Sequence, residues 1–321
     1  MPEHPGPPGD SRDAPGDAGP LAGLFLAAGA GAAASPAPGS DPPPPESFPG
    51  SLTLPGLDRP LRVIDLEQPR FEGMPVIAGH FPGYLYFLHR RHGDDYDPDL
   101  SGPRSSASGV MLCMEHSGTH LDAISHQADG QRLLGGFDAA GACNKKGFRV
   151  HGVETIPPLV GPAVLLDVAA ARGVTDLDAG ALVTAADLDA ACRRARVEVR
   201  PGDVVLVRTG NGRHWTDSER YLAGPGLGAD ASAWLAGRGV VAVGADNMAW
   251  DLIGLRDPAL NCDLPGHLLL LARRGIYILE NLRLEELAAA GAGRFTFLCT
   301  PLKFTGATGS PVRPVAILGG G

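Results

Sequence analysis

Two short apolar runs decide the fold class of this chain: Asp203–Thr209, which reads DVVLVRT, and Val240–Gly244, which reads VVAVG. Both are rich in β-branched residues and too short for a helix, which predicts two buried strands. Between them, Asp230–Ala236 is typical of a helix that ends at Gly237. The order strand, helix, strand predicts a parallel sheet flanked by helices.

The same alternation continues on both sides of this unit. A further helix is expected to begin at Thr184, because Thr184 and Asp187 have the spacing of a capping box. The other expected helices are His267–Arg274 and Arg283–Ala290, and the other expected strands are Leu61–Leu66, Val110–Met114, Phe148–Glu154, Ala163–Val168, Ile276–Glu280, Phe295–Cys299 and Val312–Leu318. We therefore expect one α/β domain over residues 56–321, with a mostly parallel or mixed sheet and flanking helices.

The N-terminal segment differs in composition from the rest. Residues 1–55 are rich in Pro, Gly and Ala, which predicts a disordered tail or an over-extended start of the reading frame. The run Gly29–Ala34 matches the dinucleotide fingerprint G-x-G-x-x-A, but no strand precedes it, so we do not expect a nucleotide site.

Charge and cysteine content exclude several function classes. The formal net charge of −9 argues against nucleic acid and acidic membranes as partners. The five cysteines are scattered and never spaced C-x-x-C, which argues against a disulfide framework and a cysteine-rich zinc site. A cytoplasmic location and a small-molecule substrate are the simpler expectations.

The polar and aromatic stretch from Gln68 to Ser108 is long for a loop in a compact domain. We expect either a lid or binding loop, with Tyr84–Tyr96 at the mouth of a pocket, or a surface excursion with packing of its own. After the strand at Asp203–Thr209, the side chains of Asn211, His214 and Trp215 either contact substrate or form a surface turn.

The densest cluster of reactive side chains is Glu115–His126, which reads EHSGTHLDAISH and holds three of the ten histidines. Imidazole nitrogen and carboxylate oxygen are ligands for Zn²⁺, Mn²⁺ or Fe²⁺. An extended segment would point His116, His120, Asp122 and His126 to one face, and a helix would pair them at i,i+4. Gly118 argues against a regular helix. Packed core histidines are the alternative to a metal site, but four such groups are costly to bury without an ion.

This cluster resembles the signature of the putative cyclase family, which includes bacterial kynurenine formamidases and isatin hydrolases. Further segments that fit the family are PGDVVLVRTG at Pro201–Gly210, VGADN at Val243–Asn247, GIYILENLRLEEL at Gly275–Leu287 and PLKFTGATGSPVRPVAI at Pro301–Ile317. The resemblance implies a swivelling β/β/α-type α/β fold and hydrolysis of amide or lactam bonds with a divalent metal, Zn²⁺ or Mn²⁺.

The resemblance also implies roles for individual residues. His116, His120 and Asp122 correspond to the primary metal ligands, and His126 to the catalytic acid/base. His267 and Glu280 match the downstream residues that complete the site, His267 as a further ligand or a packed histidine and Glu280 as a catalytic, ligating or orienting carboxylate. A homodimer or homotetramer is implied as well.

The expected reaction is hydrolysis of a small amide, lactam or lactone. An ion held by two imidazoles and a carboxylate keeps a position for water and lowers the pKa of that water, while His126 exchanges the proton. The sequence Ala123-Ile124-Ser125-His126-Gln127 departs from the formamidase pattern Ala-Pro-x-His-Phe, and the chain is longer before the motif, which favours a substrate other than the kynurenine derivative. The alternatives are a metal-dependent lyase, dehydratase or cyclase that works through an enolate, and a non-catalytic ligand-binding homologue.

Overall fold

The structure is a computed structural model that describes residues 60–319. The tail expected over residues 1–55 and the run Gly29–Ala34 lie outside the described residues. In the described part, the central sheet has nine strands in the order β1-β17-β15-β7-β9-β11-β14-β4-β16. Their bounds are β1 Arg62–Asp65, β4 His120–Asp122, β7 Leu159–Asp167, β9 Val204–Arg208, β11 Ala242–Ala245, β14 Tyr277–Glu280, β15 Arg294–Cys299, β16 Gly309–Pro311 and β17 Val315–Leu318.

The sheet is mixed, as expected. Strands β7, β9, β11 and β14 run parallel to one another, and the outer strands pair antiparallel. Alternate residues of β9 serve opposite faces: Val205 and Val207 pack in one apolar cluster, and Val204 and Leu206 in another. A strand that is buried on both faces reads as a continuous apolar run, which explains the sequence pattern of β9 and β11.

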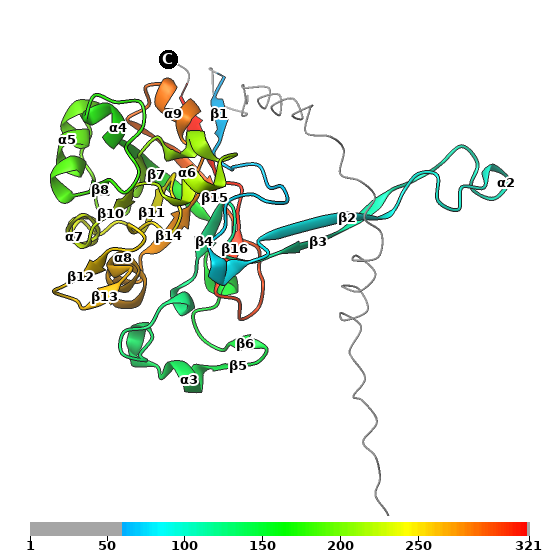
Figure 1. The fold of residues 1–321 in the computed structure, drawn as a ribbon, viewed down its shortest axis with the longest axis horizontal. Coiled ribbons are helices and arrows are strands. Elements are labelled where there is room, and N and C mark those ends of the chain that lie inside the picture. The colour runs from blue at the N-terminus through cyan, green and yellow to red at the C-terminus, as the bar shows by residue number, and fades with distance from the viewer. Residues whose placement is uncertain (1–59, 320–321) are drawn as a thin grey trace, which may run out of the picture. The chain divides into compact units, whose positions relative to one another are not determined.

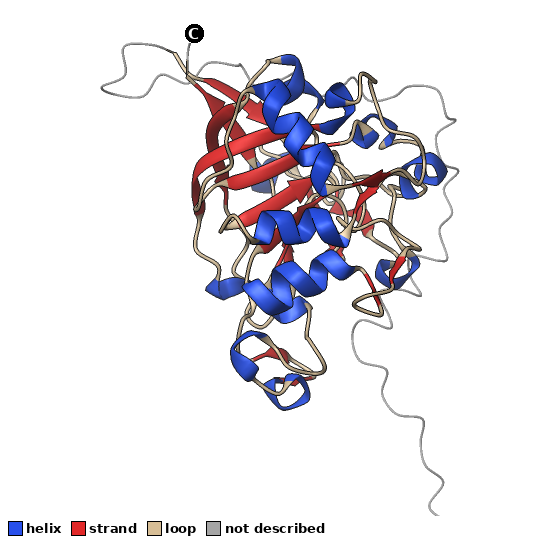
Figure 2. Ribbon diagram, turned by 90° about the vertical axis from the view of Figure 1, so that its left-hand side faces the viewer, coloured by secondary structure: helices blue, strands red, loops and turns tan. Residues whose placement is uncertain are grey.

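Helices cover one face of the sheet (Figure 2). These helices are α4 Val168–Ala171, α5 Ala185–Ala195, α7 Ala229–Ala236, α8 Pro265–His267 and the π-helical turn Leu268–Ala272 that continues α8. Leu188 of α5, Leu235 of α7 and Leu270 of the π-helical turn share the cluster that Val205 and Val207 enter. The predicted capping box of α5 is confirmed: the Thr184 side chain accepts from the Asp187 backbone N–H, and the Asp187 carboxylate accepts from the Thr184 backbone N–H. Helix α9, Glu285–Ala289, packs Leu287 on the opposite face.

The stretch from Gln68 to Ser108 is not a single long loop. Strands β2, Tyr84–Arg90, and β3, Ser108–Cys113, pair antiparallel and form an arm that projects from the sheet, with the short helix α2, Pro98–Ser101, near its tip (Figure 1). The arm fits the alternative of a surface excursion, whereas the part of the stretch before β2 packs against the rest of the domain through Met74. The expected strand at Val110–Met114 is confirmed as β3.

Two other predictions need correction. The strand expected over Phe148–Glu154 is wrong beyond its first residue, because His151 has a left-handed φ of +60° and Val153–Thr155 is a 3-10 turn. The helix expected to start at His267 starts two residues earlier, at Pro265, a residue favoured at the first helical position.

The remaining elements are short. They are the strand pairs β5 Cys143–Asn144 with β6 Gly147–Phe148, β8 Leu182–Val183 with β10 Gly226–Leu227, and β12 Arg256–Asp257 with β13 Cys262–Asp263, the helices α3 Ala139–Ala142 and α6 Ser218–Leu222, and the 3-10 turns Ala78–His80, Ile124–His126, Leu134–Gly136, Val153–Thr155 and Asn211–His214. No helix among residues 60–319 is long and apolar enough to cross a membrane.

Candidate metal centre

The three-residue strand β4 brings the histidine cluster into the sheet. It pairs antiparallel with β14, so that His120 lies opposite Glu280 and Asp122 opposite Ile278. Residues that lie opposite one another share a face, and so do residues two apart on one strand. His120, Asp122 and Glu280 therefore point to the helix-covered face, where Ile278 joins the apolar core. The geometry left open by the sequence is a mixture: a turn before β4, a short strand, and a 3-10 turn that ends at His126.

His116, His120 and Asp122 converge and are buried. Nδ1 of His116 lies 2.7 Å from Oδ1 of Asp122, and Nε2 of His120 lies 3.3 Å from the same oxygen. One ligand atom from each of the three residues lies within 4.8 Å of the others, a spacing that fits one ion. The structure thus brings together the three residues that the sequence predicts as primary ligands.

The second carboxylate oxygen of Asp122 tests whether an ion fits. Oδ2 is buried and has no hydrogen-bond partner within the described residues. Burial acts to raise the pKa of Asp122, but the imidazoles around it, with His116 and His120 in hydrogen-bonding contact, outweigh the burial and hold that pKa well below its ordinary value. A buried carboxylate that stays ionised without a donor on one oxygen is costly, and a cation removes that cost. The donor set of imidazole nitrogen and carboxylate oxygen suits Zn²⁺ or Mn²⁺.

His267 and Glu280 lie in the same site. Nε2 of His267 is 3.5 Å from Oδ2 of Asp122 and 3.3 Å from Oε1 of Glu280. The other carboxylate oxygen of Glu280 accepts a hydrogen bond from the backbone N–H of Ala249 at 2.9 Å. Asp122, His126 and His267 form a second group whose ligand atoms lie within 4.8 Å, and Asp122 is common to both groups.

Hydrogen bonds fix which ring nitrogen each histidine presents. Nδ1 of His120 faces the Gly118 carbonyl at 2.8 Å and donates to it, so Nε2 keeps its lone pair. His267 donates from Nδ1 to Asp251 at 2.8 Å, which again leaves Nε2 for the site. Such an outer partner sets the tautomer of a ligating imidazole. Burial acts to lower the pKa of His267, but the nearby carboxylates of Asp122, Asp251 and Glu280 outweigh it and raise that pKa.

His116 is oriented by residues from the far end of the chain. Its Nε2 lies 2.8 Å from Oγ1 of Thr308, and that hydroxyl donates to Glu115 at 2.7 Å. The Thr308 hydroxyl proton is therefore engaged, so Nε2 of His116 is the donor and Nδ1 faces Asp122. A Cβ at Gly309 would come within 2.7 Å of the ring, which leaves room only for glycine there.

His126 lies beside the ligand group. Its ring stacks on His116 with a centroid separation of 3.9 Å, and it lines the central cavity. Burial lowers the pKa of His126 to about 3, and neighbouring imidazoles add to the lowering while Asp122 opposes it. The imidazole is therefore neutral near pH 7 and able to accept a proton.

The cavity over the site is narrow, about 40 Å³, and every predicted site residue lines it. Its apolar wall contains Ile77, Met248 and Leu264. Sequence reasoning missed His80, whose ring centroid lies 5.2 Å from that of His116 and whose pKa is lowered by burial. The only signal for His80 is its place in the long polar stretch before β2.

The residues after β9 do not line the cavity. Asn211 is buried and donates to the Tyr221 carbonyl, and Trp215 is buried with its Nε1 bonded to the Pro69 carbonyl. His214 pairs with Asp176 at 2.9 Å. These side chains stabilise the loop, and the alternative of substrate contacts is not supported.

The stretch Tyr84–Tyr96 was expected at the mouth of the pocket. Its first part, Tyr84–Arg90, forms β2 in the arm. The segment before β2 supplies Ile77 and His80 to the cavity.

The profile described as "Putative cyclase" matches residues 64–252, more than half of the 321 residues. The chain belongs to the putative cyclase family. This family resemblance covers β1, the metal-binding cluster and the parallel strands up to β11, so the fold and the site agree with the assignment.

Similar proteins support the family from sequence and from structure. A kynurenine formamidase from Polaromonas naphthalenivorans is 27% identical over 257 residues, 80% of this chain and 91% of that protein. An isatin hydrolase from Roseibium aggregatum is 28% identical over 233 residues, 70% of this chain and 78% of that protein. The crystal structure of a novel cyclase superposes with a TM-score of 0.70 at 29% identity, covering 79% of this chain and 86% of that one.

Proposed function

We propose that this protein is a metal-dependent hydrolase that cleaves the carbon–nitrogen bond of a small amide or lactam, or opens a lactone. The observation that carries the proposal is the buried carboxylate of Asp122, which has one oxygen against two imidazoles and, within the described residues, no hydrogen-bond donor on the other. Relatives named kynurenine formamidase and isatin hydrolase support amide hydrolysis over lyase or cyclase chemistry.

His116, His120 and Asp122 would hold the divalent ion, with His267 as a further ligand. When bound, Zn²⁺ or Mn²⁺ supplies Lewis acidity and lowers the pKa of a water molecule. The hydrogen bonds from His120 to Gly118 and from His267 to Asp251 hold both Nε2 atoms toward the site in advance. These hydrogen bonds limit how far the two rings must turn when an ion binds.

His126 would move the proton. It lines the cavity, stacks on a ligand imidazole, and makes no side-chain hydrogen bond within residues 60–319 that would occupy its ring nitrogens. It takes a proton from the attacking water and returns it to the leaving nitrogen or oxygen. Glu280, anchored by the Ala249 N–H, would be the second catalytic group: its free oxygen faces His267 and orients the attacking water.

The cavity wall indicates the kind of substrate. A volume of about 40 Å³ beside the ligands admits the scissile group of a small molecule. Ile77, Met248 and Leu264 offer apolar contact to whatever flanks that group. The residues Ile124 and Ser125, which replace the formamidase pattern, lie in the 3-10 turn that places His126. We infer a substrate with an apolar flank that differs from the kynurenine derivative.

The test is a panel of amides, lactams and lactones assayed with the Zn²⁺ and Mn²⁺ forms in water enriched in ¹⁸O. Hydrolysis predicts one ¹⁸O atom in the acid product for at least one compound class. Turnover without ¹⁸O in the product would contradict hydrolysis and indicate an elimination. The variant Asp122→Asn keeps the size of the side chain and removes the ligand charge, so it controls for background reaction.

We also propose a cytoplasmic homo-oligomer, a dimer or tetramer, whose hydrolase domain spans residues 56–321. The arm supports assembly, because Phe87 and Leu88 of β2 and Met111 of β3 are exposed on a two-stranded ribbon, and such a ribbon is marginal in water by itself. The five cysteines form no disulfide, which suits a reducing compartment. Light scattering of the purified protein tests the assembly, and a monomer mass would contradict it.

A further inference from the structure

The chain makes a tight turn over residues 117–119, between the ligands His116 and His120. Gly118 in this turn has a φ of +58°, in the left-handed region. A Cβ at Gly118 would lie 2.5 Å from Nη1 of Arg70. The turn therefore requires glycine, and the guanidinium of Arg70, which comes from the segment after β1, fills the space beside it.

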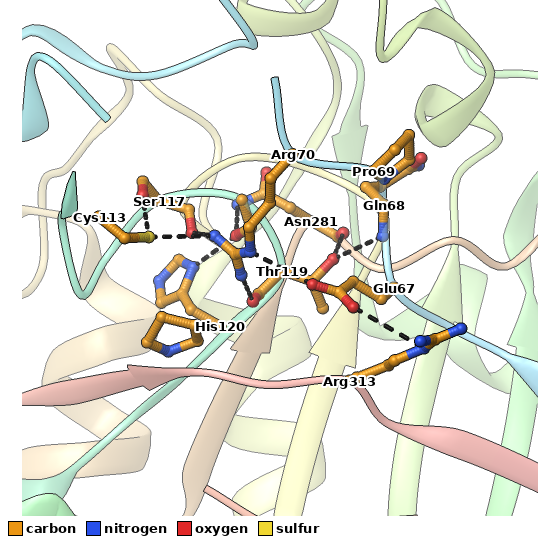
Figure 3. A network of polar contacts seen from close by, with 12 residues as sticks. Glu67, Gln68, Pro69, Arg70, Cys113, Ser117, Thr119, His120, Asn281 and Arg313 are labelled. Carbon is orange, nitrogen blue, oxygen red and sulfur yellow. Dashed lines mark hydrogen bonds and ion pairs between the residues drawn. The ribbon is translucent and has the colours of Figure 1, made fainter. Parts of the chain in front are cut away.

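All three carbonyl groups of this turn accept hydrogen bonds from side chains (Figure 3). Arg70 donates from Nη1 to the Ser117 carbonyl at 2.5 Å and from Nη2 to the Thr119 carbonyl. The Gly118 carbonyl accepts from Asn281 at 2.9 Å, in addition to the bond from His120. The planar fork of arginine suits two carbonyls of one turn in a way that a lysine ammonium does not.

The environment of Arg70 differs from that of a surface ion pair. Its side chain is only 11% exposed, and its one carboxylate partner is Glu67, at 3.2 Å from Nε. Nη1 also lies 3.5 Å from Sγ of Cys113. A guanidinium withdrawn from water is costly unless its donors are used, and here the donors are used on the ligand turn.

We propose that Arg70 is a positioning residue for the metal centre. It holds the turn in the conformation in which Nδ1 of His116 and Nε2 of His120 both face Asp122. Arg70 is not among the described residues that line the cavity, so it acts through the turn carbonyls and touches neither ion nor substrate. The inference rests on the proposed metal-dependent function. Loss of Arg70 would leave the Ser117 carbonyl without a donor and the Thr119 carbonyl with only the backbone N–H of Val312, and would let the imidazoles move apart.

The experiment compares metal affinity in the variants Arg70→Gln and Arg70→Lys with that of the unchanged protein. Arg313→Gln is the matched control, because Arg313 also approaches Glu67, at 3.9 Å, but its side chain is 58% exposed and does not contact the turn. Zn²⁺ affinity of the metal-free proteins is measured by chelator competition, and the visible absorption of the Co²⁺ forms reports the ligand geometry.

We expect Arg70→Gln to bind Zn²⁺ about 10–100-fold more weakly, the range found when a group that orients a metal ligand is lost. The visible absorption of its Co²⁺ form should also change. The Zn²⁺ affinity of Arg70→Lys should lie between those of Arg70→Gln and the unchanged protein. Arg313→Gln should match the unchanged protein in both measurements. If Arg70→Gln does not fold, Arg70→Lys decides by the same comparison. A lower melting temperature with unchanged Zn²⁺ affinity would overturn the inference, because Arg70 would then be merely structural. An unchanged protein that binds no Zn²⁺ or Mn²⁺ would instead overturn the proposed function.

Discussion

In the proposed mechanism, the chemistry of the site depends on Asp122. One of its oxygens lies within 3.3 Å of two imidazole nitrogens, and the other faces His267 at 3.5 Å. It is completely buried, so each of these contacts operates with little screening by water. Its central position explains why the two candidate ligand groups share this carboxylate.

The proposed role of His126 is tested by the variant His126→Asn. Because the acid/base group contributes to the chemical step, turnover should fall about 10²–10⁴-fold while the primary ligands still hold the ion. The measurement is kcat together with the metal content of the variant. His214→Asn is the control, since His214 is a histidine away from the cavity that pairs with Asp176. Unchanged turnover in His126→Asn would show that another group moves the proton, and loss of metal would show that His126 is a ligand.

Spacing along the sequence was sufficient to predict some of the site residues and not others. His116, His120, Asp122 and His126 lie within eleven residues, so their convergence could be predicted from the sequence. His267 and Glu280 were expected only because of the family resemblance. Asp251, Thr308 and Arg70 could not be predicted, because each is distant along the chain from the ligand that it orients and only the folded sheet brings them together.

Among the elements, the helix α5 offers a local test of the pH dependence of stability. Partial burial acts to raise the pKa of Asp187, but hydrogen bonds from Arg172 and Thr184 outweigh it and lower that pKa from 3.8 to about 2. A lowered pKa means that the ionised side chain stabilises the fold above pH 3.8 and that this contribution is lost as the pH falls toward 2.

The variant Asp187→Asn should therefore lower the free energy of unfolding by about 1 kcal/mol at pH 7, a value that allows for solvent screening of the ion pair. The difference should shrink as the pH is lowered from 4 toward 2. Urea unfolding at several pH values measures it, with Asp178→Asn, an exposed aspartate, as the control. A difference that stays constant over that pH range would contradict the assigned cause.

Helices and strands were predicted correctly where the local sequence pattern is clear. They were missed where only pairing with a distant strand forms them. The parallel strands β9, β11 and β14 and the helix α5 follow from apolar runs and a capping box. The strand β4 has three residues, too few for any pattern, and owes its existence to β14 and β16 on either side. The arm was missed because β2, although rich in aromatic and aliphatic residues, lies in a stretch of mixed polarity and finds its partner across a segment of 17 residues, from Arg91 to Ala107.

For the whole molecule, the fold explains why the site is where it is. Strand β4 pairs with β14, the last of the parallel strands, so the candidate ligands of β4 meet Glu280 of β14 and His267 of the α8 helix. α/β proteins commonly place functional groups at the carboxyl ends of such strands. The net charge of −9 is consistent with a small uncharged or weakly charged substrate and gives no support for polyanion binding.

Elemental analysis of the purified protein beside Asp122→Asn is the most direct test of the proposed metal site. We expect Zn²⁺ or Mn²⁺ at near-stoichiometric occupancy in the unchanged protein and its loss in the variant, with both proteins folded by circular dichroism. A folded, unchanged protein that carries no divalent metal, and takes up none when Zn²⁺ or Mn²⁺ is supplied, would contradict it.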